Sequence, residues 1–332
     1  MWDFSIGRSL GLMAKTAPFI VFRMVVYFGI ACAYVIVTGT GAGIGWGIGG
    51  FGDEGFRANS TMWGGIAGFG LTAGVIYLLR EYILYVVKAG HIAVLVELID
   101  GKQMPDGKSQ IAHARQVVTA RFAEASVLFA IDQLVKGVLA AVTGLIQGIA
   151  SFLPIPGVQQ IMGLVRAFLR IAIGLVDEVI LAHAIRTRSD NPWASARTAL
   201  VLYGQNAGRM MKNAAVLTVI VYGLSFLVFL VMLAPAAAVV YLIPGAWSAG
   251  GIVFALIFAW AVKAALIEPF AIACMLQAFF KVTAGQTPDP AWDAKLSQVS
   301  KKFDAIKQKS GLWSPAPAPG QTAGPDPAQQ QA

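Results

Sequence analysis

The chain has 332 residues, of which 57% are hydrophobic and only 13% are charged, and its mean hydropathy is +0.68. Soluble globular domains carry about 25% charged residues, so this composition excludes an ordinary soluble domain. The net charge of +8 comes from basic residues beside apolar stretches, with no basic patch interleaved with aromatics, which argues against a nucleic-acid partner. We therefore predict an all-α, polytopic membrane protein.

The first 17 residues mix apolar and charged side chains, a pattern typical of an amphipathic helix that lies in the membrane interface. Residues 18–38 follow as an apolar stretch long enough to cross a bilayer, with Arg23 close to its start. We interpret this stretch as the first span of a transmembrane domain that covers residues 18–282.

Glycine stands at every second position from Gly39 to Gly49. A phosphate-binding loop is disfavoured, because both flanks are apolar spans rather than a strand and a soluble helix. One remaining interpretation of residues 39–52 is a flexible outer loop. The other is close backbone packing, because glycine leaves no side chain on one face of the segment. Of these two, we expect the flexible loop.

A second span begins near Met62, and its helical pattern continues to about Ile99, so this helix extends well beyond the hydrocarbon. Residues 88–134 then form a cytoplasmic helical segment. Residues 136–181 are apolar and contain a Pro-Ile-Pro-Gly turn at 154–157, which predicts a hairpin. The hairpin either crosses the membrane or dips in and returns. Together with four other spans, a crossing hairpin gives about six transmembrane helices.

The second arm of this hairpin carries charges inside an apolar helix. At about 100° per residue, Gln159, Arg166, Arg170 and Asp177 fall within roughly 40° of one another and form a polar stripe. A charge at membrane depth costs on the order of 2.5 to 3.5 kcal/mol, so the stripe must face protein or water. The two arginines repel each other, and we expect their counter-charges to come from another segment or another subunit.

Residues 190–212 begin with Asp-Asn-Pro and predict a second cytoplasmic helix that leads into the third span. The last apolar helix, 249–282, contains Lys263, Glu268 and Pro269. The proline frees a backbone carbonyl one turn earlier, which a membrane helix tolerates only where protein or water binds that carbonyl. Residues 283–310 predict a basic C-terminal helix, and residues 311–332 a disordered tail rich in proline, alanine, glycine and glutamine.

Lysine and arginine are distributed unevenly among the segments between the spans. Segments 1–17, 80–136, 183–212 and 281–310 hold 2, 7, 5 and 6 of them, whereas the candidate outer loops hold only Arg57. This asymmetry predicts a multi-pass protein of the cell (inner) membrane with both termini in the cytoplasm. We expect basic residues of the cytoplasmic helices to bind anionic lipid; the candidates are Arg115, Arg121, Arg197 and Lys212.

Several C-terminal patterns resemble the choline transporter-like family, over roughly residues 135–305. They are Ala184-Ile185, Ser195-Ala196-Arg197-x-Ala199, Asn206, Gln277-Ala278-Phe279-Phe280, Gly285-Gln286-Thr287-Pro288-Asp289-Pro290, and a short helix from Trp292 to Phe303. The resemblance implies membrane transport of a small cation such as choline.

Two classes of function remain open. In the first, the protein is a transporter or channel for a small solute or ion and acts as a homo-oligomer, because six spans leave little room for a path within one subunit. In the second, it is a structural or assembly protein that binds lipid or a partner protein. No nucleophile stands with a base and no residues have metal-ligand spacing, so we expect no enzyme, cofactor or metal. The candidates for a translocation path are Gln159, Arg166, Arg170, Asp177, Glu178, Lys263 and Glu268.

Overall fold

The computed structural model describes residues 2–103, 109–121, 125–151, 174–242 and 250–313, and every regular element in these ranges is a helix. Four helical stretches are long and apolar enough to cross a membrane: Ala17–Gly49, Glu54–Leu79, Ala207–Ala238 and Gly251–Val282. The prediction of an all-α polytopic membrane protein is therefore confirmed.

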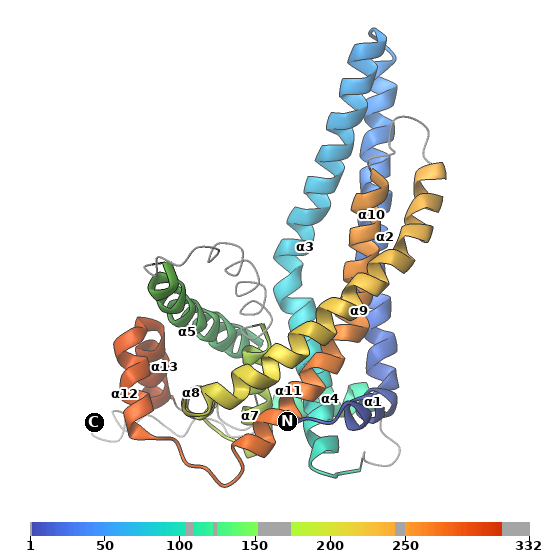
Figure 1. The fold of residues 1–332 in the computed structure, drawn as a ribbon. Helices are drawn as coiled ribbons and strands as arrows, with labels where there is room; N and C mark the ends of the chain where they lie inside the picture. The colour runs from blue at the N-terminus through green and yellow to red at the C-terminus, as the bar shows by residue number, and fades with distance from the viewer. Residues whose placement is uncertain (1, 104–108, 122–124, 152–173, 243–249, 314–332) are drawn as a thin grey trace, which may run out of the picture.

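The first two spans form a long antiparallel hairpin of α2 (Ala17–Gly49) and α3 (Glu54–Ile99). Their 33 and 46 residues correspond to about 50 and 69 Å of helix. At the tip, the side chain of Asp53 caps α3 by accepting a hydrogen bond from the Phe56 amide at 2.7 Å. The hairpin extends beyond the ends of the neighbouring helices α9 (Ala207–Leu242) and α10 (Gly250–Val262), as Figure 1 shows.

Glycine permits α2 and α3 to approach until their backbones touch. A Cβ atom on Gly41 would collide with the carbonyl of Gly64, and one on Gly45 would collide with the carbonyl of Ser60. The flexible loop predicted over residues 39–52 is therefore wrong for residues 39–49, which are helical and continue the first span. Contact between helix backbones offsets the poor helix propensity of glycine here, as in other small-residue interfaces of membrane helices.

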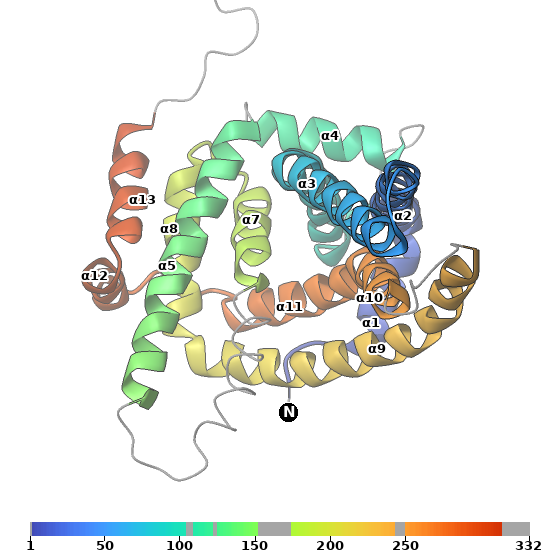
Figure 2. The ribbon, with the colours of Figure 1, turned by 90° about the horizontal axis from the view of Figure 1, so that it is seen from above.

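The third and fourth spans flank this hairpin. Helix α9 packs along α10 and α11 (Glu268–Val282), and the two views in Figures 1 and 2 show it crossing their outer side. Pro235 lies inside α9 and does not end it. Between α10 and α11 the chain passes through one turn of π-helix, η2 (Lys263–Ile267), which interrupts the regular α-helical hydrogen bonding at the centre of the last long helix. We call α10, η2 and α11 together the broken helix.

The remaining helices gather beside the spans. They are α4 (Gln110–Arg121), α5 (Ala125–Ser151), α7 (Val176–Thr187), α8 (Pro192–Gln205), α12 (Pro290–Val299) and α13 (Lys301–Leu312). Helix α5 packs against α8 and α13, on the side away from the α2–α3 hairpin (Figure 2). The predicted basic C-terminal helix is thus two helices, because the extended backbone at Ser300 separates α12 from α13.

The predicted hairpin over 136–181 is described only in part. Its first arm belongs to α5, which runs without a break from 125 to 151, so the helix boundary that we predicted near 134 is wrong. Helix α5 is not among the four candidate spans of the described chain. Most of the second arm falls on residues 152–173, which lie outside the described residues, so a crossing hairpin remains a prediction.

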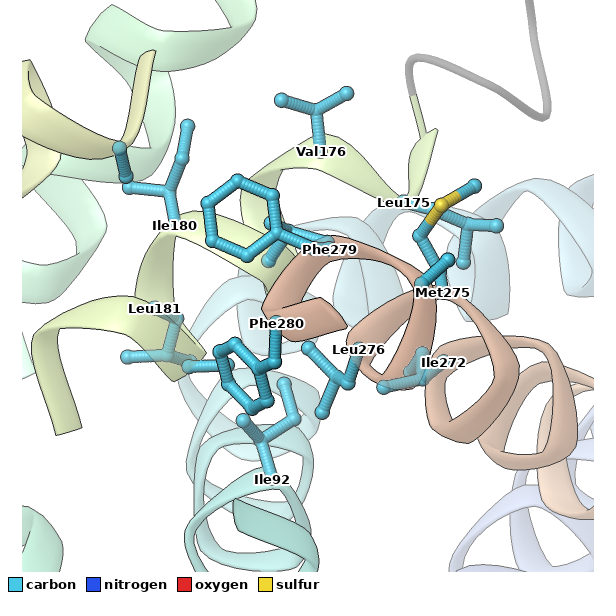
Figure 3. Close-up of a cluster of buried hydrophobic side chains, with 14 of the residues drawn as sticks. Ile92, Leu175, Val176, Ile180, Leu181, Ile272, Met275, Leu276, Phe279 and Phe280 are labelled. Atoms are coloured by element: carbon cyan, nitrogen blue, oxygen red, sulfur yellow. The ribbon is translucent and has the colours of Figure 1, made fainter. Parts of the chain in front are cut away.

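The core that holds these parts together lies between α3, α7 and α11. Figure 3 shows Phe279 and Phe280 of α11 beside Ile180 of α7, with Ile92 of α3 closing the other side. All four side chains are buried. This apolar cluster fixes α7 against the broken helix and so places the acidic residues at the start of α7.

The N-terminal segment is tied to the end of the chain. The Asp3 carboxylate accepts hydrogen bonds from Arg209 at 2.8 Å and from Asn213 at 3.0 Å, both in α9. In α1 (Ile6–Lys15), the Ser9 hydroxyl accepts a hydrogen bond from Gln277 of α11 at 2.7 Å. Helix α1 also exposes Ile6 and Leu10, which is compatible with the predicted interfacial position.

Candidate functional site

The site is built around the register change in the last long helix. The Glu268 amide donates to the Lys263 carbonyl, which is a π-type hydrogen bond. The next residue, Pro269, has no N–H group to donate. The Ala264 carbonyl therefore loses both of the amides that could serve it within the helix. This is the kind of free carbonyl that the sequence predicts, and it needs a donor from elsewhere.

Arg23 of α2 supplies that donor. Its Nε and Nη2 atoms lie 3.2 and 2.6 Å from the Ala264 oxygen, and the residue has no exposed surface. The same guanidinium lies 3.5 Å from the Glu268 carboxylate and 5.5 Å from the centroid of the Tyr27 ring. A planar guanidinium can contact a carbonyl, a carboxylate and an aromatic face at once, which a lysine ammonium cannot do equally well.

Three further charges complete the arrangement. Lys88 of α3 lies 2.9 Å from the carboxylate of Glu178 in α7 and 3.9 Å from that of Glu268. Lys263 lies 3.3 Å from the other oxygen of Glu268. We call Arg23, Lys88, Glu178, Lys263 and Glu268 the ionic cluster. It connects α2, α3, α7 and the broken helix at their common junction.

The ionic cluster is enclosed by helices but is not sealed. The side chains of Lys88, Lys263 and Glu268 keep 30%, 36% and 27% of their surface exposed, whereas Arg23 and Glu178 keep 0% and 6%. A fully dry network would bury all five groups. The exposure of three members means that the cluster can be reached from outside the fold at Lys88, Lys263 and Glu268.

Two adjacent carboxyl groups on α7 are held in different states. Burial opposes ionisation of Glu178, but the ammonium of Lys88 outweighs it and lowers the pKa of Glu178 below its usual value. Burial and the charge of Glu178 both raise the pKa of Asp177 well above its usual value. The charge therefore resides on Glu178 and the proton on Asp177.

Some buried polar atoms here have no hydrogen-bond partner among the residues that the structure describes. They are Nη1 of Arg23, Oδ1 of Asp177 and Oε2 of Glu178. Buried polar groups are nearly always hydrogen-bonded, to protein or to water. These three atoms can therefore form further hydrogen bonds with groups outside the described residues, water included.

The structure brings together part of the predicted path. Glu178, Lys263 and Glu268 belong to the ionic cluster and Asp177 adjoins it, whereas Gln159, Arg166 and Arg170 lie outside the described residues. Sequence reasoning missed Arg23 and Lys88 as members. Arg23 carries a signal, since it is a charge inside an apolar span, but its position in the sequence does not identify a partner.

The four residues predicted to bind lipid have different surroundings. Arg115 and Lys212 are exposed, and the structure does not describe the side chain of Arg121. Arg197 donates to Asp293 of α12 at 2.6 Å, and Lys307 of α13 contacts the same carboxylate at 3.0 Å. Arg197 therefore joins α8 to the C-terminal helices, with 35% of its side chain still exposed.

Comparisons of the chain with protein families, with curated proteins and with solved structures find no match. Among the described residues, no group of three or more histidine, cysteine, aspartate or glutamate side chains is arranged to hold a metal ion.

Proposed function

We propose that the protein is an integral membrane transporter or channel for a small ion or charged solute, and that the ionic cluster is part of its path. The observation that carries this proposal is a break in a membrane helix where ionisable side chains from four elements meet and stay partly exposed. Ionisable groups within membrane helices are costly, and they commonly mark such paths. Broken helices are tolerated where they line a wet cavity.

The geometry suggests how the ionic cluster could respond to a solute. Lys88 lies between two carboxylates, close to Glu178 and farther from Glu268. A cation that binds Glu268 would weaken its attraction for Lys88 and Lys263, and an anion that binds Lys88 would release Glu178. In either case, binding exchanges ion pairs between α3, α7 and the broken helix. Such an exchange couples a solute to helix movement.

The membrane location, the orientation and the oligomeric state are part of the same proposal. The uneven distribution of lysine and arginine supports an inner-membrane protein with both termini in the cytoplasm. The spans of one chain are few for an enclosed path, which supports a homo-oligomer. The resemblance to the choline transporter-like family makes choline one of the solutes to test.

Flux into liposomes tests the proposal. Liposomes that contain the wild-type protein should take up at least one solute from a panel of alkali cations, chloride and choline. Glu268→Gln should reduce this flux while the protein keeps its oligomer size, because glutamine has nearly the same shape but no charge. Lys281→Gln is a matched control, since Lys281 pairs with Asp3 outside the ionic cluster. Absence of flux for every solute with the wild-type protein would contradict transport.

A structural or assembly role is the second candidate, and the ion pairs themselves favour it. Every member of the ionic cluster has a partner of opposite charge within 4.0 Å, and Arg23 has no exposed surface. A purely structural role is compatible with such a network, which would hold the helices in register and present a surface to lipid or a partner protein. In that case Glu268→Gln should reduce thermal stability, and the wild-type protein should produce no flux.

A further inference from the structure

A cavity of about 450 Å³ lies between the spans, beside the ionic cluster. Its walls come from α2, α3 and α10, and the lining residues are Tyr34, Phe69, Ala73, Ile76, Tyr77, Val253, Leu256, Ile257 and Trp260. The volume is within the range of about 300 to 1,000 Å³ that is common for small-ligand sites. The lining is aliphatic and aromatic and includes no charged residue.

The cavity opens sideways, toward the membrane. Tyr77, Leu256 and Val253 expose 67%, 55% and 44% of their surface, and all three belong to stretches that are apolar enough to span a bilayer. The surrounding medium is therefore hydrocarbon. An apolar cavity open to hydrocarbon is suited to an acyl chain, since lipid can enter without crossing water.

Positive charge borders one end of the same cavity. Lys263 lies one helical turn after Trp260 on α10 and η2, so the two residues share a face of the helix. Trp260 contacts Tyr27 edge-to-face at 5.4 Å, and Tyr27 lies beside Arg23. The ionic cluster contains three cations and two carboxylates, so it keeps one positive charge. An anionic group held at this end would neutralise that charge.

We propose that the cavity binds one anionic phospholipid of the surrounding bilayer, with an acyl chain between α2, α3 and α10 and the phosphate group near Lys263. This site differs from the lipid-binding positions predicted on the basic cytoplasmic helices, because it combines an apolar cavity with positive charge at one end of that cavity. It does not depend on transport activity, and its test measures bound lipid rather than flux.

Filling the cavity is the decisive test. Wild-type protein is reconstituted with equal amounts of phosphatidylglycerol and phosphatidylcholine, extracted in mild detergent and examined by native mass spectrometry. The wild type should retain one phosphatidylglycerol molecule. Ala73→Trp should lose it, because the indole occupies part of the cavity and obstructs an acyl chain, whereas Leu71→Trp should retain it, because Leu71 is exposed on the same helix and does not line the cavity.

The charged end is tested separately. Lys263→Gln should still bind a lipid but should no longer prefer phosphatidylglycerol, and Lys263→Arg should keep the preference. The proposal is overturned if Ala73→Trp retains as much lipid as Leu71→Trp, or if the wild type retains both lipids equally. Thermal unfolding of each variant shows whether the comparison is made on folded protein.

Discussion

Arg23 is a full positive charge placed inside an apolar helix, and its surroundings explain why the fold accepts it. The desolvation of a buried guanidinium is offset only when its N–H groups find acceptors of good geometry. Here the acceptors are the Ala264 carbonyl, which Pro269 leaves free, and the Glu268 carboxylate. The proline and the arginine therefore depend on each other, although 246 positions separate Arg23 from Pro269 in the sequence.

Arg23→Ala should destabilise the protein by about 3 to 5 kcal/mol, because it strands a buried carbonyl and part of a carboxylate. Arg8→Ala is a matched control. Arg8 also donates to a backbone carbonyl, that of Ile99 at 2.8 Å, but in an exposed position, so its loss should cost only about 1 kcal/mol. Thermal unfolding in detergent measures both changes. Equal shifts in the two variants would contradict the proposed role of Arg23.

His91 should make stability depend on pH. Its ring is buried, stacks on Phe19 and hydrogen-bonds the Thr16 hydroxyl at 2.9 Å. Burial, with a smaller effect from Arg23, lowers its pKa from 6.5 to about 3, so the folded protein holds it neutral. Its contribution to stability is complete above pH 6.5 and falls as the pH drops from 6.5 toward 3, by about 2 kcal/mol at pH 5.

The measurement is the melting temperature between pH 8 and pH 5. His183 has its pKa lowered to about 4 by burial and contributes in the same direction, whereas the raised pKa of Asp177 contributes in the opposite direction. His91→Gln should therefore weaken the loss of stability toward pH 5 and leave the part due to His183. A variant with the same pH dependence as the wild type would refute this assignment.

At the scale of elements, the glycines of α2 form two series on different faces of the helix. One series is Gly41, Gly45 and Gly49, and the other is Gly39, Gly43 and Gly47. Gly45 contacts the backbone of α3, whereas Gly43 has nothing within 4 Å of the position of a Cβ atom. The series alternate because residues four apart share a helix face and residues two apart do not. The face with Gly45 packs against α3, and the face with Gly43 has no neighbouring atoms.

Gly45→Ala should destabilise the α2–α3 hairpin by about 1 to 3 kcal/mol, because the added methyl group forces the backbones apart. Gly43→Ala should be neutral or stabilising by up to about 1 kcal/mol, because alanine is the better helix former and meets no neighbour. Thermal unfolding of both variants checks the difference. If the two changes had the same effect, the close packing of α2 on α3 would not contribute to stability.

These glycines also show where sequence reasoning fails. Local propensity favours a loop at residues 39–49, since each glycine costs about 1 kcal/mol in a helix. The decisive fact is that Gly41 and Gly45 meet Gly64 and Ser60, a contact between segments that one-dimensional periodicity does not reveal. The sequence predicted the four apolar spans, because length and composition are sufficient for that purpose.

For the candidate site too, the sequence predicts single segments but not the contacts between them. Pro269, Lys263 and Glu268 stand close together in one apolar helix, so a broken membrane helix with a free carbonyl could be predicted from the sequence. The partners of this segment could not, because Arg23 and Lys88 come from two other helices. Pairing across helices is set by the fold, and a single sequence contains no direct record of it.

At the scale of the whole molecule, the distribution of charge predicts the orientation. A single cysteine in place of Asn59, near the tip of the α2–α3 hairpin, should react with an impermeant maleimide added outside intact cells. A cysteine in place of Gln308, in α13, should react only after permeabilisation, because basic segments stay in the cytoplasm. Both parent positions are exposed, and the native cysteines are first replaced by alanine. The opposite labelling pattern would invert the proposed topology.

The contacts of the N-terminal segment also constrain the order of assembly during synthesis. Asp3 pairs with residues of α9 at 209–213, and Ser9 hydrogen-bonds Gln277 of α11. At about 5 to 20 residues per second, a ribosome needs roughly 10 to 60 s to progress from the first of these segments to the last. Helix α1 therefore precedes these partners in synthesis and completes its packing only after every described span has been made. A nascent chain that stops before α11 leaves Ser9 without its contact to Gln277, and cellular quality control can recognise such an incomplete product.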